Sequence, residues 1–339
     1  MRLSMKQLLV FIILIALTVF ITLYELPYYI YKPGSADELS SIVNVDNHYE
    51  SEGNMHLVTV SSMRATPITF LAAKLLSYHE VLPAEKVRPD DISDEDYTFL
   101  QLHMMENSQE SSTVVAYEMA GKHVEIIESG VFVSAVLDDM PAEGILQPGD
   151  QIIKIDDHEI SNSESLIDYV NTQEAHDEVN VAFVRENEHL EEKITLQPFS
   201  DDEERLGIGI QLITQQEVEV DPDVKFSSGN IGGPSAGLMF ALEMYNQLIE
   251  EDLTRGKDII GSGSIDLDGN VLRIGSVDKK VVAGHKAGCD VFFAANENGA
   301  EGSNYEEAKA TAEALNSDME IVPVDTFEEA VQYLRAMKE

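Results

Sequence analysis

A glycine-rich segment that contains one serine carries the residue types most able to do chemistry in this sequence. Residues 229–237 read Gly-Asn-Ile-Gly-Gly-Pro-Ser-Ala-Gly and lead directly into an apolar helical stretch, residues 238–249. Glycines let a backbone approach another group closely, and Pro234 suits the first position of a helix, where its missing N–H would be unpaired anyway. The Ser235 hydroxyl would then lie where free N–H groups and the positive end of the helix dipole meet. The segment therefore predicts a nucleophilic serine with an oxyanion site attached.

Two other interpretations of this segment stay open: a phosphate-binding loop and a purely structural turn. A Walker loop needs Lys-Ser or Lys-Thr after its last glycine, whereas Gly237 is followed by Leu238 and Met239. The chain contains no Gly-x-x-x-x-Gly-Lys-Ser/Thr motif. We therefore expect no nucleotide site and no dependence on ATP.

A serine hydroxyl is a weak nucleophile unless a base lies nearby. None of the nine histidines stands at a spacing that points to Ser235, and the other option is a lysine whose pKa is lowered by burial. In a helix over residues 277–287, Lys279 would lie on a wetter face and Lys280 on a small apolar one, which favours Lys280 as the base. The alternative is a surface helix with three ordinary lysines. The small face of Lys280 would consist of Val277, Ala283, Gly284 and Ala287.

Two segments resemble the Lon-type Ser–Lys peptidases. Residues 233–237, Gly-Pro-Ser-Ala-Gly, look like that family's serine motif, and residues 261–280 resemble its stretch leading to the catalytic lysine, which falls on Lys280. The resemblance implies that Ser235 and Lys280 form the catalytic dyad. It also implies that Ser262, where the family usually has threonine, supports the lysine.

The surroundings of the serine carry two departures from the family pattern. The acidic residue usually found just before Gly-Pro-Ser is Gly232 here, and the first lysine of the family's Lys-x-Lys pair is Asp278. The first departure weakens the match to energy-dependent members, and neither affects the dyad. We expect backbone N–H groups around Gly232, Gly233 and Ser235 to hold the oxyanion.

Residues 122–198 are similar to a bacterial PDZ domain. A strand entered through a glycine (129–136) precedes an Ala-Glu-Gly-x-Leu-x-x-Gly-Asp pattern (142–150), and a helix over 163–171 is followed by two strands. In such domains an extended peptide adds to a sheet edge, and N–H groups after the glycine hold its C-terminal carboxylate. The alternative is a small sandwich with an ordinary glycine turn, and a PDZ domain does not imply catalysis. The peptide-binding loop is predicted to be Gly130, Val131, Phe132 and Val133.

The N-terminal segment predicts a membrane anchor. Residues 8–23 are apolar except for two threonines, Arg2 and Lys6 precede them, and four tyrosines follow within residues 24–31. With its flanks this span is long enough to cross a bilayer, and the tyrosines suit an interfacial belt. Positive residues stay in the cytoplasm, so we expect a single-pass protein of the cell membrane with most of the chain extracytoplasmic. The alternative is a cleaved signal peptide, although the small-x-small site at residues 34–36 lies far beyond the apolar run.

The charge and residue composition of the chain argue against several kinds of binding partner. The net charge is −40 over 339 residues, which opposes binding to nucleic acid, or to anionic lipid headgroups through the soluble part. Cys289 is the sole cysteine, so no internal disulfide can form, and it lacks the motif of a catalytic nucleophile. No residues show metal-ligand spacing, so we expect neither a metal nor a cofactor.

Together these features predict an α+β fold: a Lon-type protease domain with an inserted PDZ domain, mostly strand with two helices, preceded by one transmembrane helix. The predicted ranges are 1–36 for the anchor, 37–121 and 199–339 for the protease domain, and 122–198 for the PDZ domain. Helices are expected at 67–78 and from 104 through 120.

The predicted function is that of an extracytoplasmic serine endopeptidase that cleaves peptides or exposed protein segments. The alternative is an inactive, membrane-tethered PDZ protein that serves as a peptide-binding scaffold. Related proteases often assemble into rings, which leaves a homo-oligomer open, although no ring-forming pattern can be isolated in this sequence.

Overall fold

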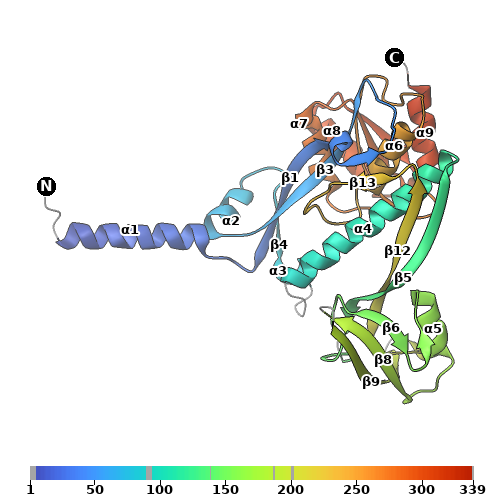
Figure 1. Cartoon of the computed structure of the whole chain (residues 1–339). Coiled ribbons are helices and arrows are strands. Elements are labelled where there is room, and N and C mark those ends of the chain that lie inside the picture. Colours follow the sequence, from blue (N-terminus) through green and yellow to red (C-terminus); the bar gives the residue numbers. More distant parts are fainter. Residues whose placement is uncertain (1–4, 89–93, 138, 186–187, 200–201, 338–339) are drawn as a thin grey trace.

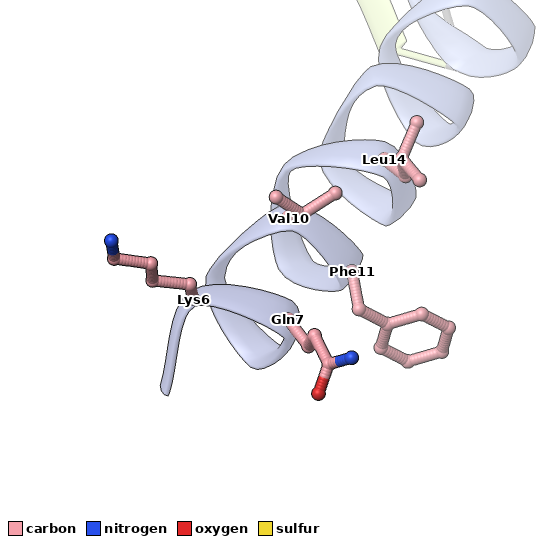
Figure 2. Close-up of a pocket in the computed structure, with 5 residues that line it drawn as sticks. All are labelled: Lys6, Gln7, Val10, Phe11 and Leu14. Atoms are coloured by element: carbon pink, nitrogen blue, oxygen red, sulfur yellow. The ribbon is translucent and has the colours of Figure 1, made fainter. Parts of the chain in front are cut away.

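The computed structural model describes residues 5–88, 94–137, 139–185, 188–199 and 202–337. The chain forms two packed units, one at each end of a pair of long strands. Helix α1 (Met5–Leu23) projects away from both units (Figure 1). The side chains of α1 are almost entirely exposed, and its mean hydropathy is 2.4. Figure 2 shows Val10, Phe11 and Leu14 projecting outward from this lone helix, with Lys6 at its first turn. By length and composition α1 can cross a bilayer.

The larger unit is built on a six-stranded sheet in the order β18-β17-β14-β3-β1-β4. Three strands come from the first quarter of the chain and three from the last quarter. The sheet thus joins chain segments from before and after the smaller unit, which is an insertion between them. The strands are β1 (Tyr28–Glu38), β3 (Asn54–Arg64), β4 (Glu80–Pro83), β14 (Asp258–Ser262), β17 (Val291–Ala295) and β18 (Glu320–Val324).

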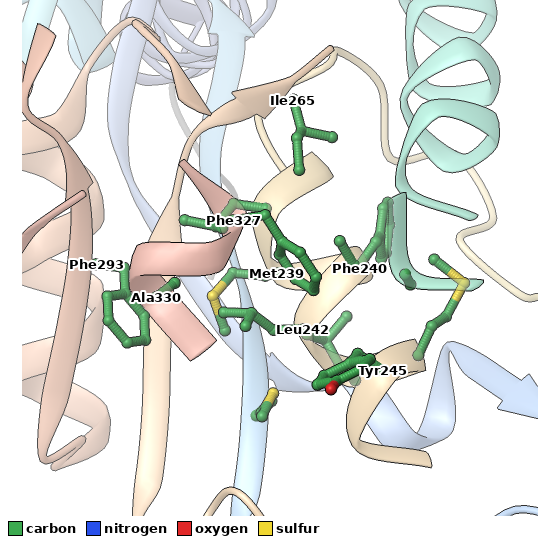
Figure 3. Packing of buried hydrophobic residues seen from close by; sticks show 14 of the residues in the cluster. Met239, Phe240, Leu242, Tyr245, Ile265, Phe293, Phe327 and Ala330 are labelled. Carbon is green, nitrogen blue, oxygen red and sulfur yellow. The ribbon is translucent and has the colours of Figure 1, made fainter. Parts of the chain in front are cut away.

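Helices cover both faces of this sheet because its central strands are apolar on both faces. Alternate residues of a strand point to opposite faces: Ile260 and Phe292 pack with α7 (Val277–Ala287) and α8 (Asn304–Leu315). Ile259 and Phe293 pack with α6 (Gly237–Leu248) and α9 (Phe327–Ala336). Figure 3 shows this second layer, in which Met239, Phe240, Leu242 and Tyr245 of α6 lie among Phe293, Phe327 and Ala330.

Helix α6 is buried along its whole length, including its polar residues Glu243, Asn246 and Gln247. The long helix α4 (Asp94–Met119) packs against it, and begins ten residues before the predicted start at 104. Helix α2 (Pro67–Ala73) is shorter than the predicted 67–78, because the chain turns after Ala73 and Tyr78 has a left-handed φ of 58°. The remaining short elements of this unit are η1 (Leu39–Ser41), β2 (Val43–Val45), α3 (Ala84–Val87), β13 (Val224–Phe226), β15 (Ser264–Ile265), β16 (Val271–Leu272) and η2 (Glu297–Gly299).

The smaller unit contains a sheet in the order β12-β5-β6-β8-β9, with β7 on β6, and α5 (Ser163–Asn171) as the one helix among its described residues. Of the two helices predicted for this unit, the described residues show one, and residues 141–145 form turns. An ion pair supports its core: the fully buried carboxylate of Asp150 accepts hydrogen bonds from Arg185 at 2.6 and 2.7 Å. The strands are β5 (His123–Val136), β6 (Gln151–Ile155), β7 (His158–Glu159), β8 (Glu178–Arg185), β9 (Glu188–Thr195), β10 (Gln197–Phe199), β11 (Asp202–Gly207) and β12 (Ile210–Asp221).

Strands β5 and β12 are paired from Ile210↔Val136 to Asp221↔His123 and form the connection between the two units. At one end Val124 and Val220 pack against the core of the larger unit. At the other end Ile208 and Leu212 pack in the core of the smaller one. The packed core of the smaller unit thus includes residues up to Leu212, beyond the predicted boundary at residue 198.

Candidate active site

Ser235, Lys280 and Ser262 meet at one point of the larger unit. The amine Nζ of Lys280 lies 2.6 Å from Ser235 Oγ and 2.7 Å from Ser262 Oγ. The Ser262 hydroxyl donates a hydrogen bond of 3.0 Å to the backbone carbonyl of Ser235. The structure thus brings together the three side chains that the sequence predicted to be catalytic.

Three different elements position these side chains. Ser262 is the last residue of β14, and Lys280 lies in the first turn of α7. Ser235 lies on the turn before α6, whose N-cap is Ala236. The prediction that Pro234 opens the helix was wrong, because the helix begins at Gly237. Ser235 therefore precedes the helix rather than forming part of it.

The serine loop is fixed by backbone contacts with the end of β14. Gly263 N–H donates to the Ser235 carbonyl at 3.2 Å, and Leu238 N–H donates to the Gly263 carbonyl at 3.1 Å. These bonds add to that from the Ser262 hydroxyl. Ser235 and Ser262 are therefore held in a single hydrogen-bonded unit.

Helix α4 forms the other wall of the serine loop, and sequence reasoning missed it. The Gln101 carbonyl accepts a bond of 2.7 Å from Gly233 N–H. The Ser108 hydroxyl donates to the Pro234 carbonyl at 3.0 Å, and Ser112 to the Gly237 carbonyl at 2.8 Å. A Cβ at position 232 would lie 2.8 Å from Gln101 Cβ, so the close approach of α4 requires a glycine.

The contact with α4 changes the predicted oxyanion site. Gly233 N–H is engaged by Gln101 in this conformation, so its predicted role was wrong here. Gly232 is exposed. Within the described residues, the N–H groups of Gly232 and Ser235 have no protein acceptor. These two donors remain for an oxyanion.

Lys280 is 3% exposed, and its hydrogen-bond partners among the described residues are hydroxyls rather than carboxylates. Burial disfavours the charged form of a lysine. It lowers the pKa of Lys280 to about 7. A neutral amine is therefore accessible near neutral pH, as a general base requires.

The neighbouring Lys279 differs in its partners rather than in its exposure. The expectation of a wetter face was wrong, because Lys279 is only 4% exposed. Its amine forms ion pairs with Glu80 at 2.9 Å and Asp278 at 3.2 Å. Burial alone would lower the pKa of Lys279, but the hydrogen bonds and charges of Glu80 and Asp278 outweigh burial and raise it. Lys279 thus stays protonated where Lys280 can be neutral.

Ser235 and Lys280 line a cleft of about 720 Å³ between the sheet and α4. Strands β1 and β3 supply one wall, with Asp37 and Thr59 among its residues, and α4 supplies the other with Gln101 and Met105. The serine loop and the start of α7 close its end. A cleft of this size accommodates several residues of an extended chain.

The predicted PDZ loop, Gly130 to Val133, is not a loop in the structure. These residues lie within β5, where they pair with β12 on one side, and Val131 and Phe132 pair with β6 on the other. A strand with both edges occupied cannot accept an added peptide. The predicted location was therefore wrong.

A different groove lies between α5 and the free edge of β12. Its volume is about 280 Å³, and α5 contributes Leu166, Ile167 and Val170. The chain enters β12 through Gly209, whose φ is 84°. The sequence contains a signal for this groove in Leu-Gly-Ile-Gly at 206–209, a second place where a strand is entered through a glycine. The opposite side of the groove is lined by Arg205, Leu206, Gly207, Ile208, Gly209, Ile210 and Leu212.

Known protein families match both units. Residues 106–196 match the PDZ domain, and residues 200–336 match the Lon protease (S16) C-terminal proteolytic domain. The Lon protease of Campylobacter jejuni is 32% identical over 102 residues, which are 30% of this chain and 12% of that protein. Lon protease 1 of Thermus thermophilus is 34% identical over 102 residues, with the same two shares. The chain spans about an eighth of the length of these curated relatives.

Solved structures of short segments are also similar. A solution structure from Geobacillus thermodenitrificans is 38% identical, covers 24% of this chain and 95% of that one, and has a TM-score of 0.23. The PDZ domain of the SdrC-like protein from Listeria monocytogenes is 31% identical, covers 25% of this chain and 88% of that one, and has a TM-score of 0.23. The family matches, rather than these scores, identify the two units: the chain joins a PDZ domain to a Lon-type (S16) proteolytic domain.

Proposed function

We propose that the protein is a serine endopeptidase that works through a Ser235–Lys280 dyad. The observation that carries this proposal is the Lys280 amine, 2.6 Å from the Ser235 hydroxyl in a pocket that lowers the pKa of the lysine to about 7. A lysine of this kind activates a serine in the way a histidine does elsewhere. The match to a Lon-type proteolytic domain supports the same reaction.

The geometry supports a two-step hydrolysis. Ser235 Oγ attacks the carbonyl carbon of the peptide bond while its proton passes to neutral Lys280. We propose that the N–H groups of Gly232 and Ser235, which have no protein acceptor among the described residues, donate to the developing oxyanion. When the C–N bond breaks, Lys280 gives the proton to the leaving amine, and an ester to Ser235 remains. A water molecule, deprotonated by Lys280, attacks the ester, and the proton returns to Ser235 as the ester bond breaks.

The type of substrate and the location of the protein are proposed from features outside the active site. The sequence has no Walker motif, so we propose cleavage of peptides or already exposed protein segments without ATP-driven unfolding. We propose that α1 anchors the protein in the cell membrane, with the catalytic unit on the extracytoplasmic side as the positive residues before α1 indicate.

The direct test of the proposed function is cleavage by the full chain. The protein, incubated with casein and with a peptide library, is expected to generate new termini detectable by mass spectrometry. The Ser235→Ala protein is expected to generate none. Absence of cleavage by the unmodified protein across several pH and salt conditions would instead leave a tethered peptide-binding scaffold.

The groove between α5 and β12 is proposed to bind the C-terminal segment of a peptide by strand addition. The half-exposed Ile167 lines it. Placing a carboxylate there removes apolar contact and faces the peptide carboxylate with a like charge. Ile167→Glu is expected to weaken peptide binding by about tenfold or more, measured by fluorescence anisotropy. Ile126→Glu is the matched control, since Ile126 is also exposed on β5 but lies outside the groove; equal losses in both variants would contradict the site.

Helix α4 contacts both the PDZ unit and the serine loop. Its His103 ring lies 5.3 Å from the Phe132 ring of the PDZ unit, and Gln101, two residues earlier, holds the serine loop. We propose that peptide binding to the PDZ unit alters cleavage through α4. A peptide that binds the groove should change kcat of the unmodified chain and have no effect on the Ile167→Glu chain. Unchanged rate and selectivity in both chains would discard the coupling.

A further inference from the structure

The segment after β3 exposes a cluster of large apolar side chains that no part of the proposed reaction uses. Ile68 and Leu71 lie on α2, and Leu75 and Leu76 lie on the turn that follows it; their exposed fractions are 48, 65, 88 and 53%. Outside α1, the other exposed isoleucines and leucines of the described chain are scattered. These are Ile126, Ile127, Ile167, Leu267 and Leu272.

The opposite side of α2 is firmly packed, so the exposed side is not the result of a loose helix. Phe70 stacks edge to face on Tyr28 at 5.1 Å, and Ala73 is buried in a small core with Ile30 and Ala65. Thr66 caps the helix through its side chain. A helix that buries one side and exposes isoleucine and leucine on the other has a surface that requires a partner.

This surface lies beside the end of α1. Helices α1 and α2 are in contact, and Figure 1 shows α2 next to the point where α1 joins β1. The join is tied by backbone bonds: Leu26 N–H donates to the Ala65 carbonyl at 2.7 Å, and Ala65 N–H donates to the Tyr28 carbonyl at 2.8 Å. Whatever surrounds the end of α1 therefore also meets the exposed side of α2.

The charge of this segment fits a lipid surface. Asp and Glu make up 62 of the 339 residues, yet residues 53–79 contain neither, while they include Arg64 and Lys74. Anionic headgroups repel acidic surfaces and attract basic ones. The part of this segment that lies beside the end of α1, residues 65–79, is therefore acid-free in a chain with a net charge of −40, and Glu25 is the acidic residue next to it in the connection from α1 to β1.

We infer that Ile68, Leu71, Leu75 and Leu76 insert into the outer surface of the bilayer as a second membrane contact beside α1. Apolar side chains of such interfacial segments enter about 5–10 Å into the headgroup and acyl boundary. Two contacts fix the orientation of the catalytic unit, because a single helix alone would let it rotate. The inference rests on the proposed anchoring by α1.

The test measures tryptophan fluorescence. Because the sequence contains no tryptophan, a single introduced tryptophan is the sole source of indole emission. Three full-length proteins carry Leu14→Trp on α1, Leu75→Trp beside α2, and Ile126→Trp on β5. Strand β5 lies on the side of the molecule away from α1 (Figure 1). Each protein is reconstituted into phosphatidylcholine–phosphatidylglycerol vesicles whose acyl chains carry bromine at shallow or deep positions, and quenching is measured.

We expect Leu14→Trp to lose most emission with deep bromines. Leu75→Trp is expected to show blue-shifted emission that shallow bromines quench most, and Ile126→Trp to stay red-shifted and unquenched. If Leu75→Trp behaves like Ile126→Trp while Leu14→Trp is quenched, the second contact is overturned and the anchor stands. Blue-shifted emission at position 75 that bromine does not quench would mean that protein, such as a second copy, covers this face, and would also overturn it. If Leu14→Trp is not quenched, α1 does not span the bilayer and both proposals fall.

Discussion

Replacement of Lys280 by methionine is expected to lower kcat for peptide hydrolysis by roughly 10³-fold or more, as does loss of the base in other serine hydrolases. The Lys280 amine is the basic group that lies within hydrogen-bond distance of Ser235 Oγ among the described residues. Methionine fills a similar volume without the amine, so the pocket stays packed while proton transfer stops. Steady-state hydrolysis of a fluorogenic peptide gives kcat, and thermal unfolding confirms that the variant is folded.

Lys279 provides the matched control for this experiment. It is adjacent in sequence and similarly buried, but its amine contacts Glu80 and Asp278 rather than the serine. Lys279→Met should keep most of the activity and lose about 1–2 kcal/mol of stability, because Glu80 is half-exposed and the broken ion pair is only partly desolvated. Normal cleavage by Lys280→Met together with inactivity of Lys279→Met would show that the wrong lysine was assigned as the base.

The contrast between these two lysines shows what the sequence could predict. The motif over residues 261–280 was enough to select Lys280 as the candidate base, because the motif is local. The helix-face argument favoured the same lysine, but its expectation of a wetter face for Lys279 was wrong. The burial of Lys279 was not predictable in this way, because its partner Glu80 lies 199 residues away in sequence. Sequence periodicity shows which residues share a face of a helix, but it does not show which strand packs against that face.

The same lack of long-range information in the sequence explains why the peptide-binding loop and the oxyanion donor Gly233 were wrongly predicted. Gly130 lies within β5 and Gly207 ends β11, and apolar residues follow both glycines in the sequence. The pairing of β5 on both of its edges shows that the free edge of the sheet belongs to β12. The role of α4 depends on contacts such as that between Ser108 and Pro234, 126 residues apart. The predicted oxyanion donor Gly233 failed for this reason, since its N–H bond to Gln101 is a tertiary contact.

The pH dependence of cleavage is expected to follow the ionisation of Lys280. Because burial lowers the pKa of this lysine to about 7, the amine is mostly protonated below that pH and cannot take the serine proton. The free enzyme's ionisations appear in kcat/KM. We expect kcat/KM to fall about tenfold for each pH unit below 7 and to level off above about pH 8. A rate that keeps rising towards pH 10 would mean that Lys280 retains an ordinary lysine pKa.

The same ionisation predicts a signature in stability that does not depend on substrate. The unfolded chain has an ordinary lysine pKa of about 10.4, so between pH 7 and about 10 it binds a proton that the folded chain has released. The free energy of unfolding of the unmodified protein should therefore rise relative to Lys280→Met by up to about 1.4 kcal/mol per pH unit in this window. Below pH 7 Lys280 is protonated in both the folded and the unfolded chain, so the full cost of burying the charged amine applies. The difference in free energy of unfolding between the two proteins then no longer changes with pH. Denaturant unfolding of both proteins at several pH values measures this difference. If it does not change between pH 7 and 10, Lys280 keeps the same pKa on folding, and a neutral lysine base is excluded whatever the cleavage assays show.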